Sequence, residues 1–198
     1  MFGLPPVTQA LILVNLAFFF APALGLPVPI NALVLWPLGP YFYPWQLLTY
    51  GFLHGGLSHL LFNLFGLYMF GAEVEQVWGT KRFLNYYLFC VVSAALTQLV
   101  VSWLMGSGAP TLGASGGVFG LLIAFALLFP NRVIVPLIPP IPMRAPIFVA
   151  LYGGVELFLG VAGTQGGVAH FAHLGGLAGG YLWIRIWGRG RSGGQRYR

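Results

Sequence analysis

The stretch GASGGVFGLLIAFALLF, residues 113–129, begins with residues that are small or of weak helix propensity and continues as an apolar run. The segment from Ser115 to Phe129 predicts a helix about 22 Å long, at a rise of 1.5 Å per residue. Pro130 follows at once and favours an end to the helix there. Ser115 therefore stands in the first turn of a short apolar helix, where backbone N–H groups are free and the helix dipole is positive.

The composition indicates that this helix lies in a membrane. Of the 198 residues, 58% are hydrophobic and only 6% are charged, whereas a soluble domain carries about 25% charged residues. Apolar windows long enough to cross about 30 Å of hydrocarbon, or close to it, recur along the chain. The sequence predicts an all-α membrane protein, a single domain over residues 1–198 with six transmembrane helices: Val7 to Leu24, Leu57 to Ala72, Phe83 to Met105, Ser115 to Phe129, Pro142 to Val161 and Val168 to Trp187.

The basic residues predict the orientation. The first apolar window has no basic segment before it and no convincing cleavage site after it, so it is interpreted as a mature helix. With six helices, all nine Lys and Arg residues fall at loops or helix ends on one side. The positive-inside rule makes that side cytoplasmic, with both termini and a short basic tail at about 188–198. The net charge of +6 also favours contact with anionic membrane lipids, whereas no docking module for nucleic acid is present.

Polar side chains inside the predicted helices are few, and each is a functional candidate. Four of them are interpreted as interhelical hydrogen-bonding groups: Asn15, Ser93, Thr97 and Gln98. Cys90 is the single cysteine and excludes an internal disulfide.

Ser115 has a candidate partner in the sixth predicted helix. Its own helix is shorter than the membrane core of about 30 Å, so Ser115 is expected several ångströms below the outer surface. His173 lies five residues after the start of the sixth helix, roughly 7 to 8 Å below that surface. Small-xxx-small pairs would let the two helices pack closely, so Ser115 and His173 are expected to meet. These pairs are Gly116 with Gly120 and Gly176 with Gly180.

A third group of polar residues belongs to the second predicted helix. His59 and Asn63 are four residues apart and share a helix face. An imidazole and an amide beside a serine can donate hydrogen bonds to a developing oxyanion, the stabilisation that acyl transfer needs. His54 is expected in the loop just above, with a structural hydrogen-bonding role.

Three separated motifs in these segments resemble the rhomboid family of intramembrane serine proteases, and the likeness covers nearly the whole chain. His54, His59 and Asn63 fit the family pattern H-x4-H-x3-N. The segment 113–116 fits G-x-S-G, and the segment 172–180 fits A-H-x-x-G-x3-G. The order of all three motifs on the expected helices is more specific than any one of them.

The resemblance implies a six-transmembrane-helix rhomboid bundle and a catalytic dyad, with Ser115 as nucleophile and His173 as general base and acid. It also implies that His59, Asn63 and the backbone amide of Ser115 bind the oxyanion. The implied substrates are single-span transmembrane proteins, cleaved near the outer face, and no cofactor is expected. Four glycines of the motifs would support the site: Gly113, Gly116, Gly176 and Gly180.

Alternatives stay open for two polar residues. The chain contains no aspartate, which favours a dyad over a Ser-His-Asp triad. Glu156 is the only carboxylate in the outer half of the predicted helices, and it either orients His173 or is a protonated or interhelical hydrogen-bonding group. His170, one turn before His173, is an alternative base. A metal site is not favoured, since the histidine spacing resembles no zinc pattern and no carboxylate pair supports it.

Two further positions concern stability. The family often carries Trp-Arg in its outer loop, whereas this chain has Trp45-Gln46 and so lacks a multi-donor anchor there. The stability of the outer loop is therefore in question. Glu75 and Gly79 resemble the family's cytoplasmic end of the second helix, which implies a structural role.

The same residues could also belong to a protein of another class, which binds a partner without catalysing a reaction. In a transporter, channel or rhomboid-like adaptor, the polar pocket would bind a partner and not cut it. Inactive relatives typically lack the serine or the histidine, and this chain has both, so the protease is favoured. A six-helix core without a large appended domain fits a bacterial inner-membrane protein best.

Overall fold

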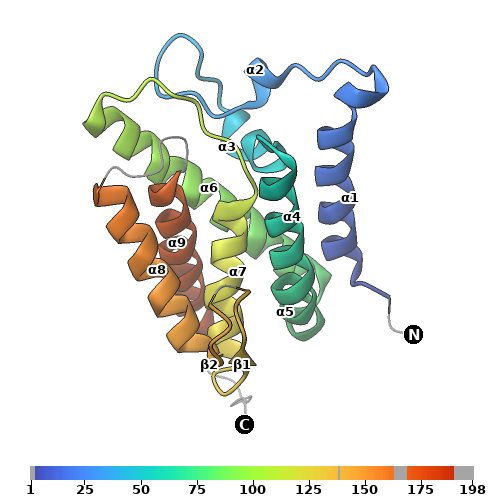
Figure 1. The fold of residues 1–198 in the computed structure, drawn as a ribbon, viewed down its shortest axis with the longest axis vertical. Coiled ribbons are helices and arrows are strands. Elements are labelled where there is room, and N and C mark those ends of the chain that lie inside the picture. Colours follow the sequence, from blue (N-terminus) through green and yellow to red (C-terminus); the bar gives the residue numbers. More distant parts are fainter. Residues whose placement is uncertain (1–2, 138, 163–168, 190–198) are drawn as a thin grey trace.

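The computed structural model describes residues 3–137, 139–162 and 169–189, which are mostly helical (Figure 1). Among these residues, three helices are long and apolar enough to cross a membrane: Leu57–Trp78, Thr80–Met105 (α6) and Ala145–Ala162 (α8). The first of them comprises α4 (Leu57–Gly66), a π-helical turn (Leu67–Gly71) and α5 (Ala72–Trp78). Each of the other three predicted positions also holds a helix: α1 (Pro6–Phe20), α7 (Ser115–Leu128) and α9 (His170–Arg189). The number of six membrane crossings stays a prediction.

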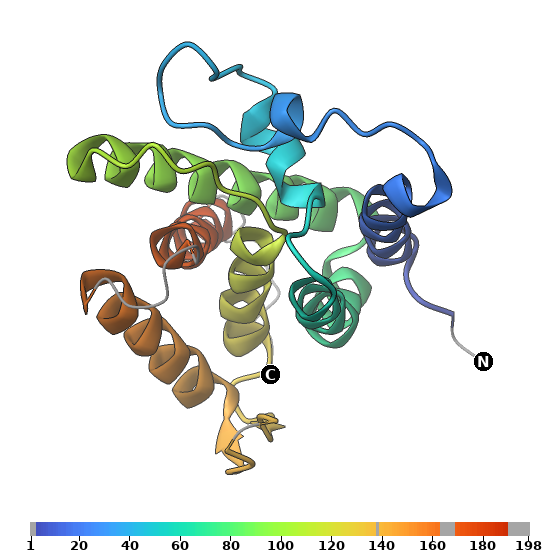
Figure 2. The same cartoon turned by 45° about the horizontal axis from the view of Figure 1, so that its top comes forward.

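Helix α7 occupies the middle of the bundle. In both ribbon views it lies between α4 and α8, with α6 and α9 packed against it (Figures 1 and 2). Ten of its fourteen residues are buried, as expected for a helix that is apolar on all sides. The chain descends from the end of α6 into the bundle before α7 begins (Figure 1). This descent puts the first residue of α7 inside the bundle.

The contact between α7 and α9 depends on glycine. A Cβ atom added to Gly176 would overlap the carbonyl oxygen of Gly116, so no larger residue fits at this crossing. Both helices also press against α6. From α6, the Tyr86 hydroxyl donates to the Gly120 carbonyl at 2.6 Å, and the Ser93 hydroxyl donates to the Gly175 carbonyl at 3.0 Å. The three helices therefore form one closely packed unit.

The four candidate interhelical groups behave in two ways. Ser93 bonds across to α9, which confirms its predicted role. The other three were wrongly predicted, because each bonds to a group four residues away in its own helix: Asn15 to the Leu11 carbonyl, Thr97 to the Ser93 carbonyl and Gln98 to the Ser102 hydroxyl. Asn15 and Thr97 bond to the preceding turn, as short polar side chains in helices often do, whereas Gln98 bonds to the following turn.

The outer loop between α1 and α4 is held by Gln46. This loop carries short helical turns at Pro22–Leu24, Ile30–Leu33 (α2), Gln46–Thr49 (α3) and Tyr50–Phe52. The Gln46 side chain is fully buried, accepts from the Trp36 N–H at 3.2 Å, and donates to the Tyr41 and Ala32 carbonyls at 3.0 and 3.4 Å. The neutral amide of Gln46 thus makes three hydrogen bonds within the outer loop, at the position where the family often has an arginine.

Glu75 joins the second membrane segment to the first. Its carboxylate is buried and accepts hydrogen bonds from the N–H groups of Val7 and Thr8 at 3.0 and 2.7 Å, and from the Thr8 hydroxyl at 2.8 Å. These N–H groups belong to the first turn of α1, where no intrahelical acceptor exists. A negative charge at that helix end is also favoured by the dipole.

Several predicted boundaries need correction. The first helix ends at Phe20 and not at Leu24, because Pro22 opens a separate 3₁₀ turn. The second continues past Ala72 to Trp78, because the acidic residues there find partners. The fifth begins at Ala145 and not at Pro142, because β1 (Val133–Ile134) pairs antiparallel with β2 (Met143–Arg144). The predicted start at Val168 and the tail from residue 190 lie outside the described residues.

Candidate active site

Ser115 is the first residue of α7, and the residues before it are fixed by the outer loop. The Gly113 N–H donates to the Tyr50 carbonyl at 3.0 Å, and Thr111 pairs with Leu35 in both directions at 2.9 Å. Gly113 has a φ of 131°, a conformation that side-chain-bearing residues rarely adopt. The backbone conformation at Gly113 thus places Ser115 at the first position of α7.

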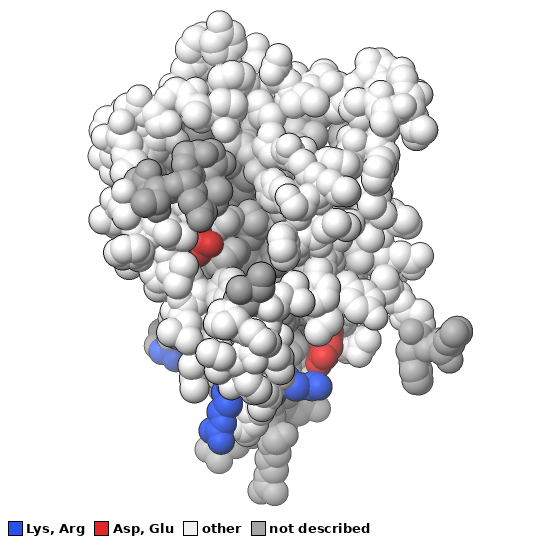
Figure 3. Space-filling model, viewed as in Figure 1, with Lys and Arg blue, Asp and Glu red and all other residues white. Residues whose placement is uncertain are grey.

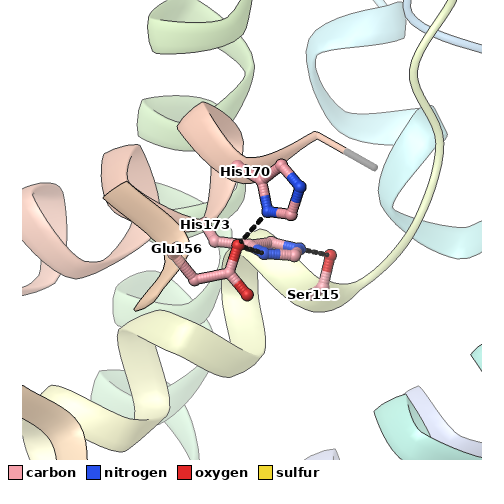
Figure 4. A network of polar contacts seen from close by, with 4 residues as sticks. All are labelled: Ser115, Glu156, His170 and His173. Atoms are coloured by element: carbon pink, nitrogen blue, oxygen red, sulfur yellow. Dashed lines mark hydrogen bonds and ion pairs between the residues drawn. The ribbon is translucent and has the colours of Figure 1, made fainter. Parts of the chain in front are cut away.

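His173 lies directly beside Ser115 (Figure 4). Its Nε2 is 2.7 Å from the Ser115 Oγ, a hydrogen-bond distance, although the two residues are 58 positions apart. The ring of Phe119 stacks on the His173 ring, with centroids 4.4 Å apart and planes 6° from parallel. Phe119 is a site residue that the sequence reasoning missed. Its signal was its position one turn after Ser115, on the same helix face.

Glu156 and His170 extend this contact (Figure 4). The Glu156 Oε2 lies 2.6 Å from the His170 Nδ1, as a hydrogen bond, and 2.9 Å from the His173 Nδ1, at ion-pair distance. The second contact lacks good hydrogen-bond alignment. The structure brings His173 to Ser115 and brings His170 to Glu156. Four polar side chains from three helices therefore form one continuous chain of contacts.

These side chains include a possible set of metal ligands. Donor atoms of Glu156, His170 and His173 all lie within 4.8 Å of one another. Histidine spacing alone could not reveal this set, because its carboxylate comes from α8. The oxygen–nitrogen distances of 2.6 and 2.9 Å are those of direct contacts. Tetrahedral zinc ligands, with bonds of about 2.0 to 2.2 Å, lie about 3.3 Å apart.

His59 and Asn63 share a cavity with Ser115. This cavity has a volume of about 960 Å³ and runs between α4, α7 and α8, and it is also lined by His173 and Glu156. A Cβ atom on Gly113 would lie 2.7 Å from the His59 ring and 3.6 Å from the Ser115 Oγ, so ring and hydroxyl flank the same backbone atom. The Asn63 amide donates to the His59 carbonyl at 2.9 Å within α4.

His54 lies in the loop just above, as expected, but its contacts differ from the expectation. Within the part of the chain that the structure describes, neither ring nitrogen makes a well-aligned hydrogen bond. The ring instead packs edge-on against His59, with centroids 5.0 Å apart. Burial, and after it the neighbouring His59, lowers the pKa of His54 to about 4, so that His54 is neutral at neutral pH.

Comparisons with known proteins agree with these motifs. A family model described as the Rhomboid domain matches residues 41–190. Rhomboid protease GluP of Bacillus subtilis is 31% identical over 144 residues, which cover 70% of this chain and 25% of that protein. Rhomboid-like protein 11, chloroplastic, of Arabidopsis thaliana is 39% identical over 60% of this chain and 40% of its own length.

Rhomboid protease GlpG of Klebsiella pneumoniae is 30% identical over 64% of this chain and 45% of its own length. The chain thus spans less than half the length of each of these three relatives. The Rhomboid domain itself covers about three quarters of the chain, and it contains every residue of the candidate site. The chain belongs to the rhomboid family.

Proposed function

We propose that this chain is an intramembrane serine endopeptidase that cleaves transmembrane segments of membrane proteins near the outer face. The observation that carries the proposal is the contact of 2.7 Å between the His173 Nε2 and the Ser115 Oγ, beside a cavity at the start of a short buried helix. Nucleophile and base within hydrogen-bond reach are the arrangement that activates a serine. The relatives named as rhomboid proteases support the same activity.

The chemistry follows from the two side chains. The Ser115 Oγ attacks the carbonyl carbon of the scissile peptide while its proton passes to the His173 Nε2. The resulting tetrahedral oxyanion accepts hydrogen bonds from the Ser115 backbone N–H and from the side chains of His59 and Asn63. When the C–N bond breaks, His173 returns the proton to the leaving amine. Water, activated by the same imidazole, then hydrolyses the acyl-enzyme.

The substrate in this proposal is a single-span transmembrane protein. Its helix must unwind at the cleavage site, because carbonyls in a helix are hydrogen-bonded and shielded. The bundle itself is oriented with both termini in the cytoplasm, in a bacterial inner membrane. The basic residues, which all fall at loops or helix ends on one side of the predicted bundle, support that orientation.

The first prediction concerns the dyad. In proteoliposomes with a single-span model substrate, Ser115→Ala and His173→Ala should each lower kcat/KM by at least about 10³-fold, because either change removes the activated nucleophile. A fluorophosphonate should label the unchanged protein covalently and should not label Ser115→Ala. Thermal unfolding in detergent verifies that each variant is folded.

Ser93→Ala supplies the matched control, because it removes a serine hydroxyl that bonds α6 to α9 and lies outside the dyad. It should keep activity within about twofold on folded protein, since one neutral hydrogen bond contributes only about 1 kcal/mol to stability. Unchanged cleavage by Ser115→Ala would refute the protease. Tight binding of the substrate by unchanged protein, without any cleavage, would favour an adaptor.

A further inference from the structure

We propose that Glu156 is a positioning residue for His173, and that His170 holds the Glu156 carboxylate in place. The contacts from Ser115 through His173 would then end at Glu156, which the second histidine anchors. This inference rests on the proposed function and adds two residues to it.

Glu156 contacts both histidines through the same oxygen. The two nitrogens of His173 have different partners, since Nε2 lies 2.7 Å from the Ser115 Oγ and Nδ1 lies 2.9 Å from the Glu156 Oε2 (Figure 4). The same oxygen accepts from the His170 Nδ1 at 2.6 Å. The side chains of His170, His173 and Glu156 are only 5%, 12% and 14% exposed, so water competes weakly for these contacts.

Glu156 also selects the tautomer of His173. A neutral imidazole carries one proton, which rests on either Nδ1 or Nε2. A carboxylate 2.9 Å from Nδ1 favours the tautomer with its proton on Nδ1, because it would repel the Nδ1 lone pair of the other tautomer. That tautomer leaves the lone pair of Nε2 free to face the Ser115 hydroxyl, as a general base requires. Without the carboxylate, nothing else in the described surroundings of Nδ1 selects this tautomer.

Glu156 also balances the charge that His173 gains during the reaction. When the Ser115 proton moves to Nε2, His173 becomes an imidazolium with protons on both nitrogens. The Glu156 carboxylate then lies at ion-pair distance from the new positive charge and stabilises it, and it remains ionised throughout. His59 on α4 also borders the site, and it lacks the negative charge that could take over this role.

The role of His170 follows from the packing of α8. Only four of the eighteen residues of α8 are buried, so apolar packing alone holds this helix weakly. Near the site, however, α8 approaches α9 closely, since a Cβ atom on Gly160 would lie 3.1 to 3.2 Å from Phe171 and His170. This close approach brings His170 within hydrogen-bond reach of Glu156. The bond fixes the carboxylate, which the weak apolar packing of α8 alone would not do.

A metal ion in the same place is the competing interpretation. Glu156, His170 and His173 would be its ligands, and binding would take the His173 Nδ1 away from the carboxylate. The contacts of 2.6 and 2.9 Å favour shared protons, because ligands around zinc lie farther apart. The experiment below separates the two interpretations.

The test uses the full chain in proteoliposomes with the single-span model substrate. Glu156→Gln keeps the shape of the side chain and removes its charge, so kcat should fall at least tenfold while KM stays within twofold. The rate of fluorophosphonate labelling should fall by a similar factor. His170→Ala should have a smaller effect, and the double variant should be no slower than Glu156→Gln alone, because both changes remove one function.

Glu73→Gln is the matched control, since this glutamate pairs with Arg132 beyond the other end of α7 and should keep kcat within twofold. His170→Ala probes the same contact from α9, so the test survives if Glu156→Gln does not fold. Wild-type kcat in both single variants, with Ser115→Ala inactive, would overturn the positioning role and leave the protease standing. Equimolar zinc in purified protein that is lost in His170→Ala would also overturn it.

Discussion

At position 113 a single methyl group is expected to disable the site. Gly113→Ala would force an alanine into a φ of 131° and put its Cβ 2.7 Å from the His59 ring. Backbone strain of this kind costs about 1 to 3 kcal/mol, and the displaced ring borders Ser115. Cleavage should fall at least tenfold and the unfolding temperature should drop, as measured by the peptidase assay and thermal unfolding.

Gly108→Ala is the control for this prediction. It lies in the same connection before α7, and a Cβ atom there meets nothing within 4 Å. Its activity and unfolding temperature should stay close to those of the unchanged protein. Equal behaviour of the two alanine variants would contradict the role of Gly113.

The sequence predicts the meeting of Ser115 and His173 because helix length and glycine spacing both carry that information. The sequence leaves the partner of Glu156 open, because this partner depends on the orientation of α8 about its own axis, relative to α9. A helix with few buried residues has no apolar stripe that defines its rotation. The bond between His170 and Glu156 thus had no signal in the sequence, although each residue could be singled out as a buried polar group.

At the scale of elements, Glu75 is expected to stabilise α1 through its first turn. Glu75→Gln removes the charge from three hydrogen bonds to Val7 and Thr8, and bonds to charged groups contribute about 1.5 to 3 kcal/mol. The free energy of unfolding in detergent should therefore fall by about 1 to 3 kcal/mol. Glu73→Gln breaks a more exposed ion pair, worth about 0 to 1 kcal/mol, and should change little. Equal losses in both variants would contradict the capping role.

Element boundaries were less predictable than the elements. A helix lies at each of the six predicted positions, because long apolar runs are a strong signal, while their number as membrane crossings stays a prediction. The second was predicted to end at Ala72, where acidic residues begin, but Glu75 is buried there by bonds to α1. The apolar pattern alone does not show that a distant segment will supply hydrogen bonds to a buried carboxylate. The hairpin of β1 and β2 was missed for a similar reason, since two residues per strand are too few for a periodic pattern.

At the scale of the whole molecule, the basic residues and the outer loop lie at opposite ends of the long axis of the bundle. On the face drawn in Figure 3, the visible Lys and Arg atoms gather at one end, where Figure 1 shows the hairpin of β1 and β2. The outer loop and the end of α6 lie at the opposite end (Figure 1). Large apolar side chains are exposed on the helices between these ends, including Phe62 on α4, Leu96 on α6 and Leu151 on α8. This distribution is that of an integral membrane protein, whose flanks face lipid.

The axis predicts which cysteines a membrane-impermeant maleimide can reach. Ser107→Cys follows the end of α6 and is exposed, whereas Val133→Cys is exposed on β1 at the basic end. The native Cys90 is fully buried and should give little background. In intact bacterial cells with a permeabilised outer membrane, Ser107→Cys should be labelled at once, and Val133→Cys only after detergent opens the inner membrane. The opposite pattern would invert the orientation and would place the site near the cytoplasmic face, because Ser115 follows the α6 end of the bundle.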